Sequence, residues 1–160
     1  MAEKVIQSIV ERHDIEEILW DVDGTLVIGH GLKSNDSLVE SIDQFERLKL
    51  LLKGLPNVQH LLVSRNRHFA FYNPSLDTKV NEHGFDGYIK GLNLDLKRSK
   101  GSINEKRSLL IDDSLEECAF ALGETDKTSV VAALQVKKHK GMFASLDKGD
   151  YLYWTVKYGI

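Results

Sequence analysis

The chain has 160 residues, of which 42% are hydrophobic and 28% are charged, and its formal net charge is −3 at pH 7. This composition is ordinary for a globular protein, and the chain is long enough to bury a core, so we expect one domain over residues 1–160. The acidic net charge argues against a general nucleic-acid binder, which usually has a basic surface. The single cysteine, Cys118, excludes an intramolecular disulfide, and we expect it to be a packed core thiol.

The first half of the chain alternates helical and strand patterns. Residues 3–13 have the spacing of an amphipathic helix and not the pattern of a signal peptide. Residues 18–20 form an apolar run typical of a buried strand. Apolar residues then recur at helical spacing after a group of capping residues, which predicts a helix over 34–53. Residues 61–63 predict a second strand.

The second half of the chain continues this alternation. The predicted elements are a helix over 75–83, a short strand or turn over 85–89, a strand over 109–111, a helix over 114–122, a strand over 129–136 and an aromatic segment of undecided type over 147–158. Strands that alternate with helices predict an α/β fold with a mostly parallel sheet and helices on both faces. Ligands bind to such sheets beyond the carboxyl ends of the strands.

Two carboxylates directly follow the first predicted strand. Asp21 and Asp23 are separated by one residue, and Gly24 comes next. This arrangement can hold a divalent cation and present a carboxylate nucleophile at the same time. A calcium loop with the same start would need a series of further oxygen ligands, which the residues after Gly24 do not offer. An acidic turn without a function is the remaining alternative.

Two later strands also end in polar residues. Ser64 follows the strand over 61–63, and the adjacent acids Asp112 and Asp113 follow the strand over 109–111. Neighbouring carboxylates are costly to ionise together unless a cation lies between or beside them. A metal ion shared with the acids of the first strand is the simplest explanation of this pattern.

The order of these groups resembles the motifs of the haloacid dehalogenase-like (HAD) superfamily, whose members are mostly phosphatases. The resemblance implies a Rossmann-like three-layer sandwich in which Asp21 forms an aspartyl-phosphate and Asp23 acts as general acid and base. It also implies that Ser64 binds a phosphoryl oxygen. Mg²⁺ would be held by Asp21, the Asp23 carbonyl and Asp113, while Asp112 would orient a ligand or a metal-bound water.

The family also places a phosphate-binding lysine ahead of the last acidic strand, near the start of a helix. Lys97, Lys100 and Lys106 all lie in this window. A capping-box pattern begins at Ser102, so Lys100 comes just before a predicted helix and is favoured, with Lys97 as the runner-up. Lys106 would lie late in that helix, where a cation suits the helix dipole. For any single one of them, a solvated surface charge is the alternative.

The intervals between the motifs leave no room for the cap domain that many HAD enzymes insert. Residues 27–33 contain glycines suited to a small flap hairpin, so we expect an open site. The resemblance implies a Mg²⁺-dependent phosphomonoester hydrolase, with a nucleotide or a polynucleotide end favoured as substrate. The alternatives are a sugar or small-metabolite phosphatase, a phosphoprotein phosphatase, and a non-catalytic phosphate-binding protein on an HAD scaffold.

Other charged and polar residues are weaker candidates. Basic residues gather at 97–100 and at 137–140, and either group could form a rim that receives a phosphorylated polymer, although a solvated face is the favoured interpretation. Arg65 is a candidate phosphate contact next to Ser64. His30 and His68 lie near the expected site loops, where a histidine is more often a surface or packing residue.

No apolar run approaches the length of a transmembrane helix. We therefore expect a cytoplasmic protein whose partner is a phosphorylated substrate and not a membrane. Nucleic acid is left open as a substrate, and the oligomeric state is also left open.

Overall fold

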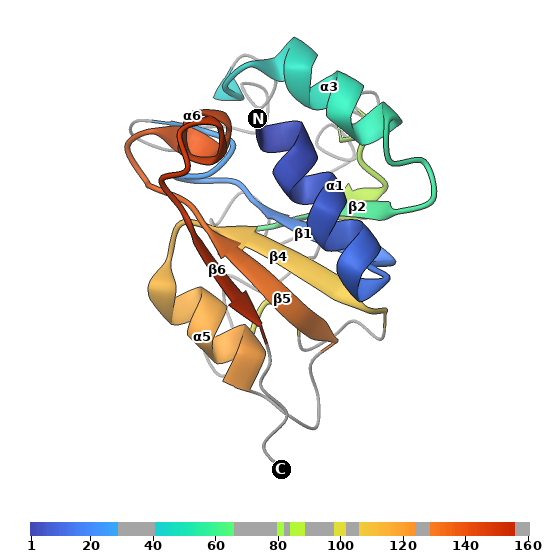
Figure 1. Ribbon diagram of the computed structural model, residues 1–160, viewed down its shortest axis with the longest axis vertical. Coiled ribbons are helices and arrows are strands. Elements are labelled where there is room, and N and C mark those ends of the chain that lie inside the picture. The colour runs from blue at the N-terminus through green and yellow to red at the C-terminus, as the bar shows by residue number, and fades with distance from the viewer. Residues whose placement is uncertain are drawn as a thin grey trace.

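The structure is a computed structural model that describes residues 1–28, 41–65, 80–81, 84–88, 98–101, 106–123 and 129–155. Its strands are β1 (Glu17–Asp21), β2 (Gln59–Val63), β3 (Gly87–Tyr88), β4 (Ser108–Asp112), β5 (Val130–Gln135) and β6 (Leu152–Thr155). Its helices are α1 (Ala2–His13), α3 (Phe45–Lys53), α5 (Leu115–Gly123) and α6 (Gly141–Asp147). The strands form one sheet in the order β3-β2-β1-β4-β5-β6 (Figure 1).

The sheet is parallel except for β6, which pairs antiparallel with β5. All residues of β1 and β4 are buried, as expected for central parallel strands that are covered on both faces. Side chains alternate between the two faces, so Trp20 packs in the core with α1, α3 and α6, while Leu19 packs with α5. The predicted α/β fold is confirmed, and its three layers are compatible with a Rossmann-like sandwich.

Most of the predicted elements that lie in the described residues agree with the structure, but the helix predicted over 34–53 is interrupted at residues 42–44, between the helical Ser41 and Phe45. Helix α3 begins only at Phe45, because Gln44 has a left-handed backbone (φ 50°) and Ile42 pairs with Val27 in an antiparallel bridge. A pairing between distant segments therefore overrides the local helical pattern. The earlier part of this predicted helix, at 34–40, lies outside the described residues.

Several other predictions also fall outside the described residues. They are the flap hairpin beyond Ile28, the helix over 75–83 except for its last described residues at 80–81, and the capping box over 102–105. The aromatic segment of undecided type supplies β6. Helix α6 was not predicted, because it is short and its first residue, Gly141, follows Lys140, which makes no side-chain capping bond.

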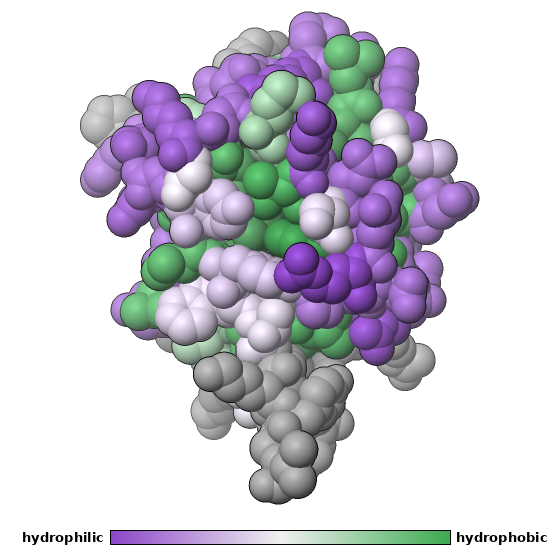
Figure 2. All heavy atoms as spheres, in the orientation of Figure 1, coloured by the Kyte–Doolittle hydropathy of each residue, from purple (hydrophilic) through white to green (hydrophobic). Residues whose placement is uncertain are grey.

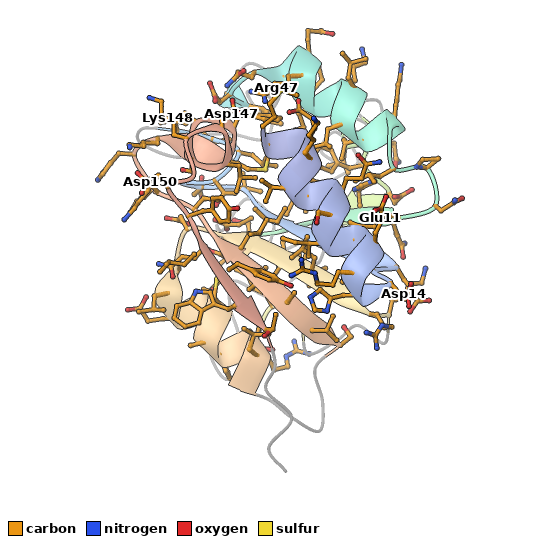
Figure 3. All side chains as sticks on the ribbon, viewed as in Figure 1. Glu11, Asp14, Arg47, Asp147, Lys148 and Asp150 are labelled. Carbon is orange, nitrogen blue, oxygen red and sulfur yellow. The ribbon has the colours of Figure 1, made fainter. Side chains whose placement is uncertain are left out.

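Arg47 joins three helices on one face of the sheet. Its guanidinium lies 2.6 Å from Glu3 on α1 and 2.7 Å from Asp147 at the end of α6, and it stacks 4.5 Å from the centre of the Phe143 ring. Figure 3 shows Arg47 beside Asp147 where these helices meet. This contact fixes α6, and with it the turn between β5 and α6, against the rest of the fold.

The single cysteine is buried in the smaller core under α5, so the prediction of a packed thiol is confirmed. Burial raises the pKa of the Cys118 thiol above its ordinary value. On the face shown in Figure 2, hydrophilic residues lie at the upper left, across the top and along the right-hand edge, and hydrophobic residues are visible between them. Among the helices of the described residues, none has the length and apolar character needed to cross a membrane.

Candidate active site

The candidate site lies where the chain changes direction across the sheet. Strand β1 pairs with β2 on one side and with β4 on the other, so the chain first builds the sheet outward to β3 and then returns to build β4, β5 and β6. In parallel α/β sheets, ligands bind at the carboxyl ends of the strands at such a switch point. Asp21 ends β1 and Asp112 ends β4, so both acids lie at this point.

Three carboxylates converge at this edge of the sheet. Asp21, Asp112 and Asp113 each offer one oxygen, and these oxygens all lie within 4.8 Å of one another. Asp21 and Asp112 are buried, whereas Asp113 is partly exposed. The acids predicted from two separate strand ends are therefore brought together.

A buried lysine lies between two of these acids. The Lys100 Nζ atom is 2.7 Å from Asp21 Oδ1 and 2.6 Å from Asp112 Oδ2, and the residue is only 3% exposed. Lys106, in contrast, is exposed and donates to Gln59 at the start of β2, at the opposite edge of the sheet. Lys97 lies outside the described residues. Of the two candidate lysines that the structure describes, only Lys100 contacts the acids. Because Lys100 is buried, it is not part of the basic surface rim expected at 97–100.

The electrostatics of the cluster follow from burial and from its surplus of negative charge. Burial raises the pKa of Asp21 to about 6, although the ammonium of Lys100 opposes this change. Burial and the neighbouring Asp21 charge raise the pKa of Asp112 to about 7. Burial would lower the pKa of Lys100, but the carboxylates of Asp21 and Asp112 raise it well above its ordinary value. Lys100 is therefore charged, and one cation does not balance three carboxylates.

The two adjacent acids have different surroundings. Asp112 accepts hydrogen bonds on both oxygens, from Lys100 Nζ and, at 3.0 Å, from the backbone N–H of Ser114. Burial also raises the pKa of Asp113, although its hydrogen bond with Asp21 opposes this shift. Asp112 is therefore the acid that orients Lys100, and Asp113 is the more accessible of the two. The carboxylate of Asp23 is not part of the cluster found among the described residues, so a metal contact from Asp23 would come from its backbone carbonyl.

The loop after β1 is shaped around Asp21 and Asp113. Thr25 is fully buried, and its hydroxyl donates to Asp21 Oδ2 at 2.8 Å, so both oxygens of Asp21 have partners. Gly24 has a left-handed backbone (φ +85°), and a Cβ atom there would lie 2.5 Å from Asp113 Oδ2. Only glycine therefore lets this loop pass so close to the second pair of acids.

Ser64 and Arg65 follow β2 beside the acids. Ser64 is buried, and it comes directly after Val63, whose register partner in β1 is Asp21. Arg65 pairs with a residue of α5. Its Nε and Nη2 atoms donate to the carboxylate of Glu117 on α5, and Nη2 also donates to the carbonyl of Arg98 at 2.8 Å. Whether Arg65 also contacts a phosphate stays a prediction.

The Arg65–Glu117 pair is a feature that the sequence analysis did not identify. It connects the end of β2, helix α5 and the segment that carries Lys100, and Glu117 Oε2 itself lies 3.8 Å from Lys100 Nζ. Thr25 was also missed as a partner of Asp21. The position of Thr25, four residues after Asp21, could have indicated that the two side chains are in contact. No local pattern indicated a role for Glu117.

The donor set fits a hard divalent cation. It consists of carboxylate oxygens only, with no thiol or imidazole in the cluster found among the described residues. Mg²⁺ and Ca²⁺ prefer such ligands. Because Lys100 leaves the cluster with excess negative charge, a bound cation would stabilise the ionised acids. His30 and His68 lie outside the described residues. Comparison with protein-family models, curated proteins and solved structures finds no match to this chain.

Proposed function

We propose that this chain is a Mg²⁺-dependent phosphomonoester hydrolase of the HAD type. The observation that carries the proposal is the buried carboxylate of Asp21, which ends the central strand between Lys100 and Thr25 and lies against two further acids. A carboxylate held in this way is oriented for attack. The strand order, with Asp21 at the switch point, supports the same proposal.

Each residue has a chemical role in this proposal. An oxygen of Asp21 attacks phosphorus, and the bond from phosphorus to the ester oxygen breaks as Asp23 donates a proton to the leaving group. Asp23 then takes a proton from a water molecule, which attacks the aspartyl-phosphate and releases phosphate. Ser64 and Lys100 bind the equatorial oxygens of the transferred group, where negative charge accumulates.

Asp21, Asp113 and the Asp23 carbonyl would hold Mg²⁺, which would neutralise charge on the phosphoryl group. Asp112 accepts a hydrogen bond from Lys100 and so keeps the ammonium beside Asp21. A nucleotide or a polynucleotide end is the substrate that we favour.

A phosphatase screen tests the proposal. The purified protein should hydrolyse 4-nitrophenyl phosphate with Mg²⁺, should lose activity in EDTA, and should show which of nucleotides, phosphorylated oligonucleotides, phosphopeptides and sugar phosphates it prefers. The Asp21→Asn variant controls for a contaminating phosphatase. Phosphate binding without turnover of any of these substrates would favour the non-catalytic alternative.

A further inference from the structure

A basic turn borders the candidate active site. Residues 137–140 follow β5 at the carboxyl edge of the sheet, next to the end of β4 that carries Asp112. All four side chains are exposed. The backbone N–H of Val136, just before the turn, donates to the Asp112 carbonyl at 2.9 Å. The turn is therefore attached to the same strand end as the acids.

The turn is also held against the loop that follows Asp21. The N–H of Met142 donates to the Thr25 carbonyl at 2.9 Å, and Gly141 (φ +78°) leaves room for Ile28, whose Cδ1 atom would lie 2.7 Å from a Cβ there. Behind the turn, the buried hydroxyl of Ser145 accepts from the N–H of Lys137 and donates to the Gly141 carbonyl. Contacts with the site loop and with α6 thus fix the position of the turn.

The charges of the turn are not equivalent. Lys140 lies 2.6 Å from Asp150, and Lys137 lies 4.0 Å from the same carboxylate, so one acid partly neutralises both. Figure 3 shows Asp150 on this side of the molecule. Lys138 makes no ion pair with any residue that the structure describes. Among the lysines of the turn, Lys138 is therefore the one whose charge is not compensated by a carboxylate of the described residues.

Lys138 also packs against the loop that follows Asp21. Its Cγ atom lies 3.1 Å from the point where a Cβ of Gly24 would lie, and Asp113 Oδ2 lies 2.5 Å from that same point. The side chain therefore passes over Gly24 beside Asp113, with its ammonium on a flexible stem. A cation in this position can meet a substrate group that extends out of the site.

We infer that Lys138 binds a second phosphate group of the substrate, one that is not transferred. This inference rests on the proposed function and narrows its substrate to a phosphomonoester with a neighbouring phosphate. In the proposed function, Lys100, Ser64 and the cation that the acids would hold are the partners of the transferred group, so an additional lysine at the rim serves a different anion. Lysine is a common point-charge partner for phosphate. A nucleoside bisphosphate and the phosphorylated end of an oligonucleotide both supply this chemistry.

Kinetic specificity gives the first test. We compare kcat/KM for adenosine 3′,5′-bisphosphate with kcat/KM for 4-nitrophenyl phosphate. The ratio of the two values should fall about fivefold in Lys138→Ala, because about fivefold is the upper range of the effect of one exposed ion pair. Lys138→Arg should retain most of the ratio. Lys53→Ala is the matched control, because Lys53 is exposed at the end of α3, ahead of the amino end of β2. An unchanged ratio in Lys138→Ala would overturn the inference.

Binding gives a second test that does not depend on turnover. Asp21→Asn protein with Mg²⁺ should bind adenosine 3′,5′-bisphosphate more tightly than adenosine 5′-monophosphate, and adding Lys138→Ala should remove the difference. The same comparison between a 5′-phosphorylated oligothymidylate and thymidine 5′-monophosphate, which lacks the neighbouring phosphate, tests the polymer as the source of the second phosphate. If neither ligand loses affinity in Lys138→Ala, the inference fails. A Lys138-dependent preference in a protein that hydrolyses none of the esters would instead refute only the proposed function.

Discussion

The ammonium of Lys100 lies 2.7 Å from the carboxylate of Asp21, and both side chains are almost completely buried. Asp112 accepts from the same ammonium at 2.6 Å. A buried cation between two carboxylates is costly to separate from either, because removing one partner leaves an uncompensated buried charge. The site is therefore part of the core that stabilises the fold.

Replacing Lys100 by methionine should destabilise the protein in the absence of metal. We expect the free energy of unfolding to fall by about 3 kcal/mol, since Asp21 and Asp112 lose their common partner. Urea denaturation in EDTA measures the change. Lys106→Met is the matched control, because Lys106 is exposed and donates to Gln59 at the amino end of β2, away from the acids. A loss in Lys100→Met no larger than in the control would contradict the buried ion pairs.

Mg²⁺ should raise the melting temperature of the wild-type protein, because it binds the folded acid cluster and not the unfolded chain. Asp113→Ala should remove most of this shift, since Asp113 is the partly exposed acid that remains available to a cation. Calorimetry with and without Mg²⁺ tests both statements. Equal shifts in the two proteins would exclude Asp113 from the ligand set.

Gly24→Ala should disrupt the site through a steric clash. The new Cβ would lie 2.5 Å from Asp113 Oδ2, and the backbone there has φ +85°. Gly149→Ala is a matched control, because Gly149 also has a positive φ (+70°) but no atom within 4 Å of its Cβ position. We expect each variant to lose about 1 kcal/mol from backbone strain, and Gly24→Ala to lose more. Equal losses of stability would argue against the close approach of Gly24 to Asp113.

The buried carboxyl group of Glu17 should make the stability of the fold depend on pH, and this effect is separate from the candidate active site. The Glu17 side chain is at the start of β1 and is 1% exposed, and its Oε1 atom has no hydrogen-bond partner among the described residues. Burial raises the pKa of Glu17 from 4.5 to about 7, although the charge of Lys106 opposes this shift. Because the folded state binds this proton more tightly, the contribution of Glu17 to stability falls as pH rises from 4.5 to about 7 and is constant above.

The Glu17→Gln variant should therefore be more stable than wild type at pH 8, by on the order of 2 kcal/mol. The difference should shrink as the pH falls toward the ordinary pKa of a glutamate. Urea denaturation of both proteins across this pH range gives the comparison. A gap that does not change with pH would show that Glu17 is ionised in both states or neutral in both.

Local sequence patterns predicted the parts of this molecule that depend on short-range order. Strands that end in Asp21, Ser64 and Asp112 were predicted because buried parallel strands are apolar and their carboxyl ends are polar. Lys100 was favoured because of its place before a predicted helix, and the structure brings it to the acids. Whether these residues perform the proposed chemistry stays a prediction.

Features that depend on contacts between distant segments could not be predicted in this way. The bridge between Val27 and Ile42 interrupts the helix predicted over 34–53, and only the folded chain brings these two residues together. The pairing of Arg65 with Glu117 was not predicted, because Glu117 comes from a helix far along the chain. The position of Lys138 depends on the path of the turn before α6, a helix for which the sequence has no capping signal.

The central claim is that Asp21 is a nucleophile, and trapping the covalent intermediate tests it most directly. Protein mixed with Mg²⁺ and a hydrolysed phosphomonoester, quenched in acid and digested, should contain one added phosphoryl group on the peptide that includes Asp21, at an acid-stable and base-labile position. Asp21→Asn should lack this adduct and retain less than about a hundredth of the wild-type rate. Turnover in Asp21→Asn close to that of wild type, with no adduct in either protein, would contradict the proposed mechanism.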